Sequence, residues 1–203
     1  MITLRYTLLS DGSSDAALMP IIEWLIAQHR PEIGVLGQAA EGLGAIGLSL
    51  SKRIPAALRL YPCDVLFVHR DAEGVPFGAR LDEIVAAVGT SHNQFITIIP
   101  VRMTEAWLFS DETAIRSAAA NQAGKIDLKL PAKKSWESMP DPKQFLFDVL
   151  ELASEKSGRA LSKFKPQRQR HLVAQRSGDF SALRGLASFD FFESQLVEIL
   201  GKI

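Results

Sequence analysis

The sequence predicts an α/β fold with an open, mainly parallel four-stranded sheet that is flanked by helices and followed by a helical C-terminal extension. Two observations lead to this prediction. Short apolar runs alternate with longer amphipathic segments four times along the first 122 residues. The runs are apolar throughout instead of alternating with polar residues, which is typical of strands covered on both faces in a parallel sheet.

The first strand and helix are marked by a turn between them. Residues 2–10 read ITLRYTLLS and form a strand, and the turn DGSSD leads into an amphipathic helix through residues 16–29. Ser13 or Ser14 is expected to cap this helix, and Pro20 is expected to lie in its first turns.

The same alternation continues along the chain. The expected elements are a strand at 33–38, a helix at 48–61, a strand at 64–69, a helix at 75–89, a strand at 94–101 and a helix at 104–120 capped by Thr104. After Gln122 the pattern changes to a long loop followed by helices. We therefore expect an α/β domain over residues 1–122, with a loop and a helical extension packed on it over residues 123–203.

Composition limits the class of protein. The chain has 47% hydrophobic and 23% charged residues, and no apolar run is long enough to span a membrane. The first residues lack the basic leader and cleavage site of a signal peptide, so we expect a cytoplasmic protein. Cys63 is the single cysteine, and the four histidines are scattered without the spacing of a zinc site.

The net charge of zero conceals a segregation of charge along the chain. Between Leu152 and Arg184 there are eight basic residues and two acidic ones. Lys163, Lys165, Arg168 and Arg170 form the densest cluster. Such a segment is either a solvated helical surface or a surface that neutralises the phosphates of a nucleic acid, each contact adding a salt-dependent increment to binding.

Acidic residues follow three of the predicted strands. Asp11 follows the first strand, His69, Asp71 and Glu73 follow the third, and Glu105 follows the fourth. The carboxyl ends of parallel strands meet at one edge of the sheet, where ligands bind in open α/β folds. Carboxylates gathered there repel one another unless a cation or a proton lies between them, and Mg²⁺ suits such oxygen ligands. The pattern therefore favours metal-assisted phosphoryl transfer or phosphodiester hydrolysis.

Several of these residues lie in motifs that resemble those of a known family. A first strand ending in an acid, and a later strand ending in D-x-D-x-E-G, form the signature of the TOPRIM domain of topoisomerases, primases and nucleases of the overcoming-lysogenization-defect type. HRDAEG, residues 69–74, resembles the second motif, with Asp71 matching its second Asp, Glu73 its later acid and Gly74 its Gly. Asp11 stands where the family has Glu.

The resemblance is closer to small stand-alone bacterial TOPRIM-like proteins of unassigned function. In these proteins E-x-W-L-x-x-D follows the fourth strand, and TEAWLFSD, residues 104–111, matches it. LSKFKP and ASFDFFESQL resemble their helical tail. The resemblance implies a metal-dependent nuclease acting on DNA or RNA, with an ATPase partner in bacterial defence. Asp11, Asp71, Glu73 and Glu105 would be catalytic, and Asp11, His69, Asp71 and Glu73 would hold Mg²⁺ or Mn²⁺.

Two departures from the family pattern support an alternative function. His69 replaces the first Asp of D-x-D, and Asp11 is one methylene shorter than Glu. A neutral imidazole is a poor ligand for Mg²⁺ and a better one for Mn²⁺. The alternative is a non-catalytic TOPRIM-like module that binds nucleic acid or a partner protein. A hydrolase of nucleotides or small phosphates is a third hypothesis.

Each signal also has a simpler explanation. Without a site, Asp71 and Glu73 are solvated acids in a loop after a buried strand. Asp11 is then part of an ordinary Asp-Gly turn, and Glu105 is an acid that stabilises the first turn of a helix. We expect Trp107 to be a core residue instead of a platform for a nucleobase, because its neighbours are apolar. GLGAIG, residues 42–47, matches G-x-G-x-x-G, but it follows the second strand instead of the first, which disfavours a dinucleotide site.

Overall fold

The computed structural model describes residues 2–91 and 94–203, so His92 lies outside the described residues. Four parallel strands form one sheet in the order β2-β1-β3-β4. The strands are β1 (Thr3–Leu9), β2 (Gly34–Ala39), β3 (Val65–His69) and β4 (Phe95–Ile98). This confirms the predicted open α/β sheet and its four strands.

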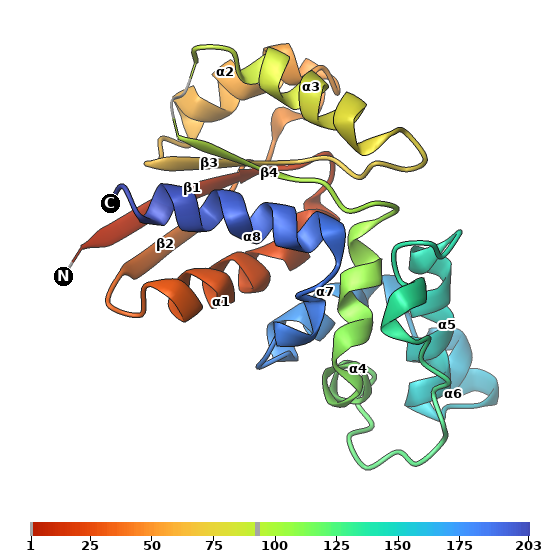
Figure 1. Ribbon diagram of the computed structural model, residues 1–203. Coiled ribbons are helices and arrows are strands. Elements are labelled where there is room, and N and C mark those ends of the chain that lie inside the picture. The colour runs from red at the N-terminus through yellow and green to blue at the C-terminus, as the bar shows by residue number, and fades with distance from the viewer. Residues whose placement is uncertain (1, 92–93) are drawn as a thin grey trace.

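Helices cover both faces of the sheet (Figure 1). On one face α1 (Met19–His29) lies beside α8 (Ala187–Leu200), and on the other α2 (Leu50–Leu60) packs against α3 (Phe77–Val88). Alternate residues of each strand enter the two cores. Tyr6 and Leu8 face α1 and α8, whereas Leu9 faces α2 and α3. The strands are therefore apolar on both sides, as the sequence pattern indicates.

The chain changes direction across the sheet at β1 and β3. From β1 the chain runs outward to β2 on one side, and it then crosses to β3 and β4 on the other side. The space outside the carboxyl ends of β1 and β3 is therefore the switch point, where ligands bind in open α/β sheets.

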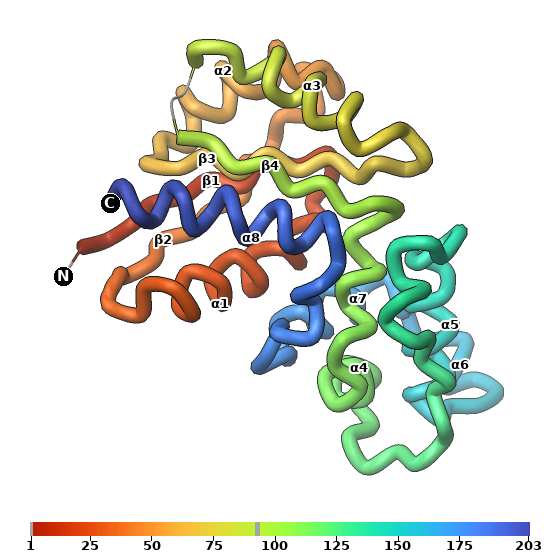
Figure 2. The backbone as a smooth tube through the Cα atoms, viewed as in Figure 1, coloured from red at the N-terminus to blue at the C-terminus, as the bar shows by residue number. Residues whose placement is uncertain are grey.

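The remaining helices lie beyond this end of the sheet (Figure 2). They are η3 (Thr104–Ser110), α4 (Glu112–Ala118), α5 (Pro142–Ser154), α6 (Gly158–Lys163) and α7 (Pro166–Arg176). Short 3-10 turns occur at η1 (Ser13–Leu18), η2 (Leu43–Ile46), η4 (Lys133–Ser135) and η5 (Ser181–Leu183). The segment between α4 and α5 is a loop interrupted only by η4 within the described chain, as expected for that stretch.

The C-terminal extension shares its core with the sheet. The buried cluster that contains Tyr6 and Phe67 of the sheet also contains Leu146 of α5, Val173 of α7 and Phe192 of α8. The last helix, α8, returns to the sheet and runs along β4 (Figure 2). Residues 123–203 therefore complete one face of the α/β layer as well as extending it.

Trp107 is a core residue, as predicted. Its side chain is buried and lies edge-on to Phe189 at 5.3 Å and stacked on Phe192 at 6.3 Å between ring centroids. These aromatic contacts anchor η3 to α8 and so fix the residues that precede Trp107 at the edge of the sheet. None of the helices in the described part of the chain is both long and apolar enough to cross a membrane.

Two predicted helix starts are wrong in detail. Ser13 and Ser14 do not cap the first helix; instead the carboxylate of Asp15 accepts the N–H of Gly12 at 3.1 Å. The expected helix at 104–120 is divided into η3 and α4, because Asp111 accepts the N–H of Ala114 and starts a new helix there. Thr104 is not a cap, and its side chain serves the site described next.

Candidate functional site

His69 is the centre of a buried charge cluster at the switch point. It is the last residue of β3, and its side chain is 1% exposed. Its Nε2 lies 3.2 Å from Oδ1 of Asp71 and 3.0 Å from Oγ1 of Thr104. Its Nδ1 lies 3.5 Å from Oδ2 of Asp15, in a charged contact that is longer than a well-aligned hydrogen bond. The imidazole thus lies between two carboxylates.

The two carboxylates keep this imidazole charged. Burial alone lowers the pKa of His69, but the hydrogen bonds and charges of Asp15 and Asp71 outweigh it and raise the pKa to about 10. Burial raises the pKa of Asp15, yet the contact with His69 and the Gly12 N–H hold it below its usual value. At neutral pH the cluster therefore holds one cation between two anions.

Thr104, the first residue of η3, holds the carboxylate of Asp71 in position. Its backbone N–H donates to Oδ1 of Asp71 at 3.0 Å, and its hydroxyl donates to the same oxygen at 3.3 Å. On the other side Arg80 donates from Nε to the backbone carbonyl of Asp71 at 3.1 Å. The Asp71 carboxylate is therefore held by His69 of β3 and Thr104 of η3, and α3 holds its backbone.

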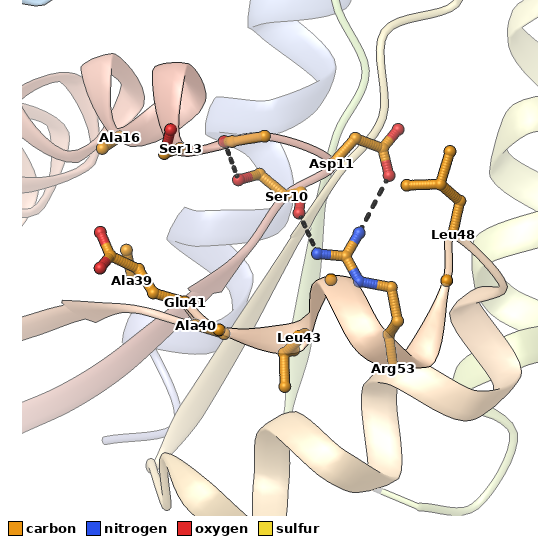
Figure 3. A pocket seen from close by; sticks show the side chains of 14 residues that line it. Ser10, Asp11, Ser13, Ala16, Ala39, Ala40, Glu41, Leu43, Leu48 and Arg53 are labelled. Carbon is orange, nitrogen blue, oxygen red and sulfur yellow. Dashed lines mark hydrogen bonds and ion pairs between the residues drawn. The ribbon is translucent and has the colours of Figure 1, made fainter.

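Asp11 lies in a second group of charges, at the end of β1. Arg53 Nη1 contacts one oxygen of Asp11 at 3.2 Å, and Arg70 Nε contacts the other at 3.2 Å. Arg53 also donates from Nη2 to the carbonyl of Ser10 at 2.7 Å (Figure 3). Burial raises the pKa of Asp11 above its usual value, although Arg70, His69 and Arg53 lower it. Arg70 extends the group to Glu83 at 3.4 Å.

Glu105 anchors the basic helix α7 to the same edge. The Glu105 carboxylate is buried and pairs with Arg170, whose guanidinium also lies 5.9 Å from the ring centroid of Phe147. Because α7 packs against η1, this ion pair brings the basic segment next to the ends of β1 and β3. Arg170, one of the residues expected to bind nucleic acid, has Glu105 as a partner within the chain, and its nucleic-acid contact stays a prediction.

The acids of this edge are matched by the protein's own cations. The ion pairs join five carboxylates to five basic groups in the described part of the chain. The carboxylates are those of Asp11, Asp15, Asp71, Glu83 and Glu105, and the basic groups are those of Arg53, His69, Arg70, Arg80 and Arg170. With His69 protonated, these ten ion-paired groups together carry no net charge.

In this arrangement the carboxylates do not fit a resident Mg²⁺ or Mn²⁺. Both oxygens of Asp11 contact guanidinium groups, and Oδ1 of Asp71 faces three hydrogen-bond donors. A protonated imidazole has no lone pair for a metal. Among the described residues, no three His, Cys, Asp or Glu side chains are grouped to hold a metal ion, and the expected metal stays a prediction.

Of the residues expected from the sequence, Asp11, His69, Asp71 and Glu105 lie at this edge, and Glu73 does not join them. Glu73 has a positive φ of 49°, its side chain is exposed, and it takes part in none of the ion pairs among the described residues.

The sequence prediction missed Asp15, Arg53 and Thr104. Asp15 lies four residues after Asp11 in SDGSSD, which is about one helical turn, so the spacing could have identified it as a second acid of the site. Arg53 lies between apolar residues on the buried face of α2, which is unusual for arginine and marks a buried ion pair. Only the fold places Thr104 opposite Asp71.

Three pockets lie side by side along this region. The β1–β2 pocket, at the ends of those strands, has a volume of about 270 Å³, the α7 pocket between η1 and α7 about 440 Å³, and the α6 pocket between α6 and α7 about 260 Å³. The first two share Ser13 and Ala16, and the last two share Arg168. The α6 pocket is lined by Lys156, Lys163, Lys165 and Arg168 and by no acidic residue of the described chain.

No protein-family model, curated protein or solved structure matches the chain.

Proposed function

We propose that this chain is a TOPRIM-like module that binds nucleic acid through its α6 and α7 helices and does not cleave it. The single observation that carries the proposal is the position of the basic surface, defined as Lys156, Lys163, Lys165 and Arg168. These side chains line one pocket, and that pocket adjoins the α7 pocket, with which it shares Arg168.

The charge of this surface favours a polyanion. Lys163, Lys165 and Arg168 are exposed, and none of them forms an ion pair with an acid among the described residues. Cations that have no partner in the protein release counterions from nucleic-acid phosphates when they bind, which is the main source of sequence-independent affinity. Arg170 has a different role, because it holds α7 in place through Glu105.

The edge cluster supports the non-catalytic alternative over hydrolysis. A charged His69 occupies the position between Asp15 and Asp71, and two arginines hold Asp11. These groups satisfy the carboxylates without a divalent ion. The cluster then serves to position η1, η3 and α7 around the pockets.

Binding to labelled single-stranded and double-stranded DNA and RNA, measured by fluorescence anisotropy in EDTA, tests the proposal. We expect the triple variant Lys163→Gln, Lys165→Gln, Arg168→Gln to lose most of its affinity for these nucleic acids, whatever their base sequence. The control is Lys52→Gln with Arg59→Gln, which removes two exposed positive charges from α2 on the other face of the sheet, and the loss is compared per charge removed. Equal loss in the control, or no loss in the triple variant, would reject the proposal.

A metal-dependent phosphodiester hydrolase is the second candidate. The observation that favours it is the convergence of carboxylates from β1, β3 and η3 on one edge, as the resemblance to TOPRIM nucleases implies. Strand cleavage with Mg²⁺ or Mn²⁺, abolished both by EDTA and by Asp71→Asn, would replace the first proposal with this one. The ATPase partner and the role in bacterial defence stay predictions from the same resemblance.

A further inference from the structure

The β1–β2 pocket combines apolar walls with oxygen acceptors. Ala39, Leu43 and Leu48 provide apolar surface, and Asp11 and Glu41 provide carboxylates (Figure 3). Arg53 closes its side wall with a guanidinium that is almost fully buried, and its Nε has no hydrogen-bond partner among the described residues. The pocket therefore presents aliphatic side chains and the carboxylate of Glu41, while Asp11 is paired with Arg53 at its side.

The glycine-rich segment leaves this pocket open. Gly42 has a left-handed φ of 71°, which turns the chain around the pocket directly after Glu41. A Cβ placed on Gly42, Gly44 or Gly47 would meet no other atom within 4 Å. Residues 42–47, which match G-x-G-x-x-G, thus form a short turn that is one wall of the pocket, not the start of a long helix.

The adjoining α7 pocket has the opposite chemistry. Arg168, Arg170 and His171 line it together with serine and glutamine side chains, and no carboxylate lines it in the described chain. It shares Ser13 and Ala16 with the β1–β2 pocket, so the two pockets adjoin at η1, and a single ligand that occupies both would pass across these two residues. Such a ligand needs an apolar ring system with hydroxyl or amino donors at one end and an anion at the other.

The geometry points to a nucleotide site across these two pockets, with the nucleoside in the β1–β2 pocket, the phosphate in the α7 pocket, and Glu41 accepting hydrogen bonds from the ribose hydroxyls. The volumes of about 270 and 440 Å³ lie around the lower limit of pockets that hold small molecules. The exposed Arg168 supplies the charge for the phosphate.

Glu41 is the carboxylate best placed for the ribose. It lies two residues after the end of β2, at the carboxyl edge of the sheet where ligands bind in open α/β folds. Asp11 is held by Arg53 and Arg70, whereas Glu41 joins none of the ion pairs among the described residues. A ribose has one more hydroxyl donor than a deoxyribose, so Glu41 favours ribonucleotides.

If the bound nucleotide is the end of a nucleic-acid strand, this inference rests on the proposed function. If it is a free nucleotide, the inference is independent of that function. The two sources carry the same phosphate monoester, so the test includes both. The probes are the four nucleoside 5′-monophosphates, their 2′-deoxy forms, inorganic phosphate, and a 5′-phosphorylated oligoribonucleotide beside its 5′-hydroxyl form. Affinities are measured by titration calorimetry with the full chain.

Wild type is expected to bind ribonucleotides about tenfold more tightly than deoxyribonucleotides, since one hydrogen bond to a charged acceptor separates them. Glu41→Gln should remove this discrimination, and Glu151→Gln, an exposed control on α5, should keep it. Gly44→Leu should weaken nucleotide binding by narrowing the β1–β2 pocket, whereas Gly78→Leu on α3, also with open space at its Cβ, should not.

The outcomes separate this inference from the proposed function. Mononucleotide binding identifies a free nucleotide, and tighter binding of the 5′-phosphorylated oligonucleotide identifies a strand end; both support the site if Glu41→Gln removes the preference for ribose. Equal affinity of wild type for ribonucleotides and deoxyribonucleotides would overturn the inference even if polymers bind. If wild type prefers ribonucleotides to deoxyribonucleotides but binds no oligonucleotide, the proposed function is rejected and the nucleotide site is kept.

Discussion

His69 and Asp71, two residues apart at the end of β3, face each other, with Nε2 of the imidazole 3.2 Å from Oδ1 of the carboxylate. The opposite ring nitrogen faces Asp15 from η1. A histidine in this place supplies the positive charge that gathered carboxylates require. The charge stays inside the protein and cannot be removed by a chelator.

The charge of His69 should make stability fall at alkaline pH. The folded state holds the proton up to a pKa of about 10, whereas the unfolded chain releases it near 6.5, so the unfolded state binds fewer protons between these values. The contribution is complete below about pH 6.5 and is lost as the pH rises to about 10. In this window the free energy of unfolding of wild type should fall by about 1.4 kcal/mol per pH unit more than that of His69→Gln.

Chemical denaturation at pH 6, 7, 8 and 9 measures this difference. His69→Gln keeps every other ionisable group, so groups that do not contact His69 cancel in the comparison. Parallel stability curves for wild type and His69→Gln across this range would show that His69 is not protonated in the folded state.

Replacing the internal cation by an acid should create a metal site. His69→Asp removes the positive charge between Asp15 and Asp71 and adds a third carboxylate, so the variant should be about 3–5 kcal/mol less stable than wild type in EDTA. Mg²⁺ or Mn²⁺ should restore part of that stability, because a ligand that binds only the folded state raises it. Thermal unfolding with and without the ions measures the effect, and a similar stabilisation of wild type would contradict the account.

Arg170 and Glu105 should be strongly coupled. Arg170→Ala leaves the buried Glu105 carboxylate without its cation and should cost about 3–5 kcal/mol. Adding Glu105→Gln to Arg170→Ala should recover part of that loss, because the amide does not carry the unpaired charge. A double-mutant cycle by urea denaturation gives the coupling energy, and additive effects of the two substitutions would show that the pair does not hold α7.

The packing of β1 against β2 should depend on a glycine. Gly37 pairs with Tyr6 across the strands, and a Cβ at Gly37 would lie 2.3 Å from atoms of the Tyr6 ring. The ring is held by the hydrogen bond from its hydroxyl to Glu23 at 3.0 Å. Gly37→Ala should therefore lower stability by about 1–3 kcal/mol.

Gly78→Ala is the matched control for that prediction. Its Cβ would meet open space on α3, and alanine favours a helix over glycine, so stability should stay the same or rise. Equal effects of the two substitutions would mean that the close approach of Tyr6 to Gly37 is not a constraint.

The sequence predicts the sheet and its charged edge because both follow from local rules. Continuous apolar strands require cover on both faces, and parallel strands bring their carboxyl ends to one edge. Asp11, His69 and Asp71 are placed there by chain direction alone. The edge is therefore predictable without knowledge of any long-range contact.

The partners of those residues are not predictable in this way. Whether Asp71 faces a metal or an imidazole depends on side-chain orientation, and so does the exposure of Glu73. Arg53 arrives from α2 and Thr104 from η3, at distances set by the packing of separate elements. The return of α8 to the sheet likewise depends on long-range aromatic packing that leaves no local pattern.

Oligonucleotide binding by wild type in EDTA, measured over a series of salt concentrations, decides between a nucleic-acid-binding module and a metal-dependent hydrolase. We predict binding without any divalent ion, and a logarithm of affinity that falls linearly with the logarithm of salt, by about 0.7 to 0.9 per phosphate contact. Arg168→Gln should make that slope shallower by about one contact. Absence of binding in EDTA, with binding and strand cleavage appearing when Mg²⁺ or Mn²⁺ is added, would contradict this prediction.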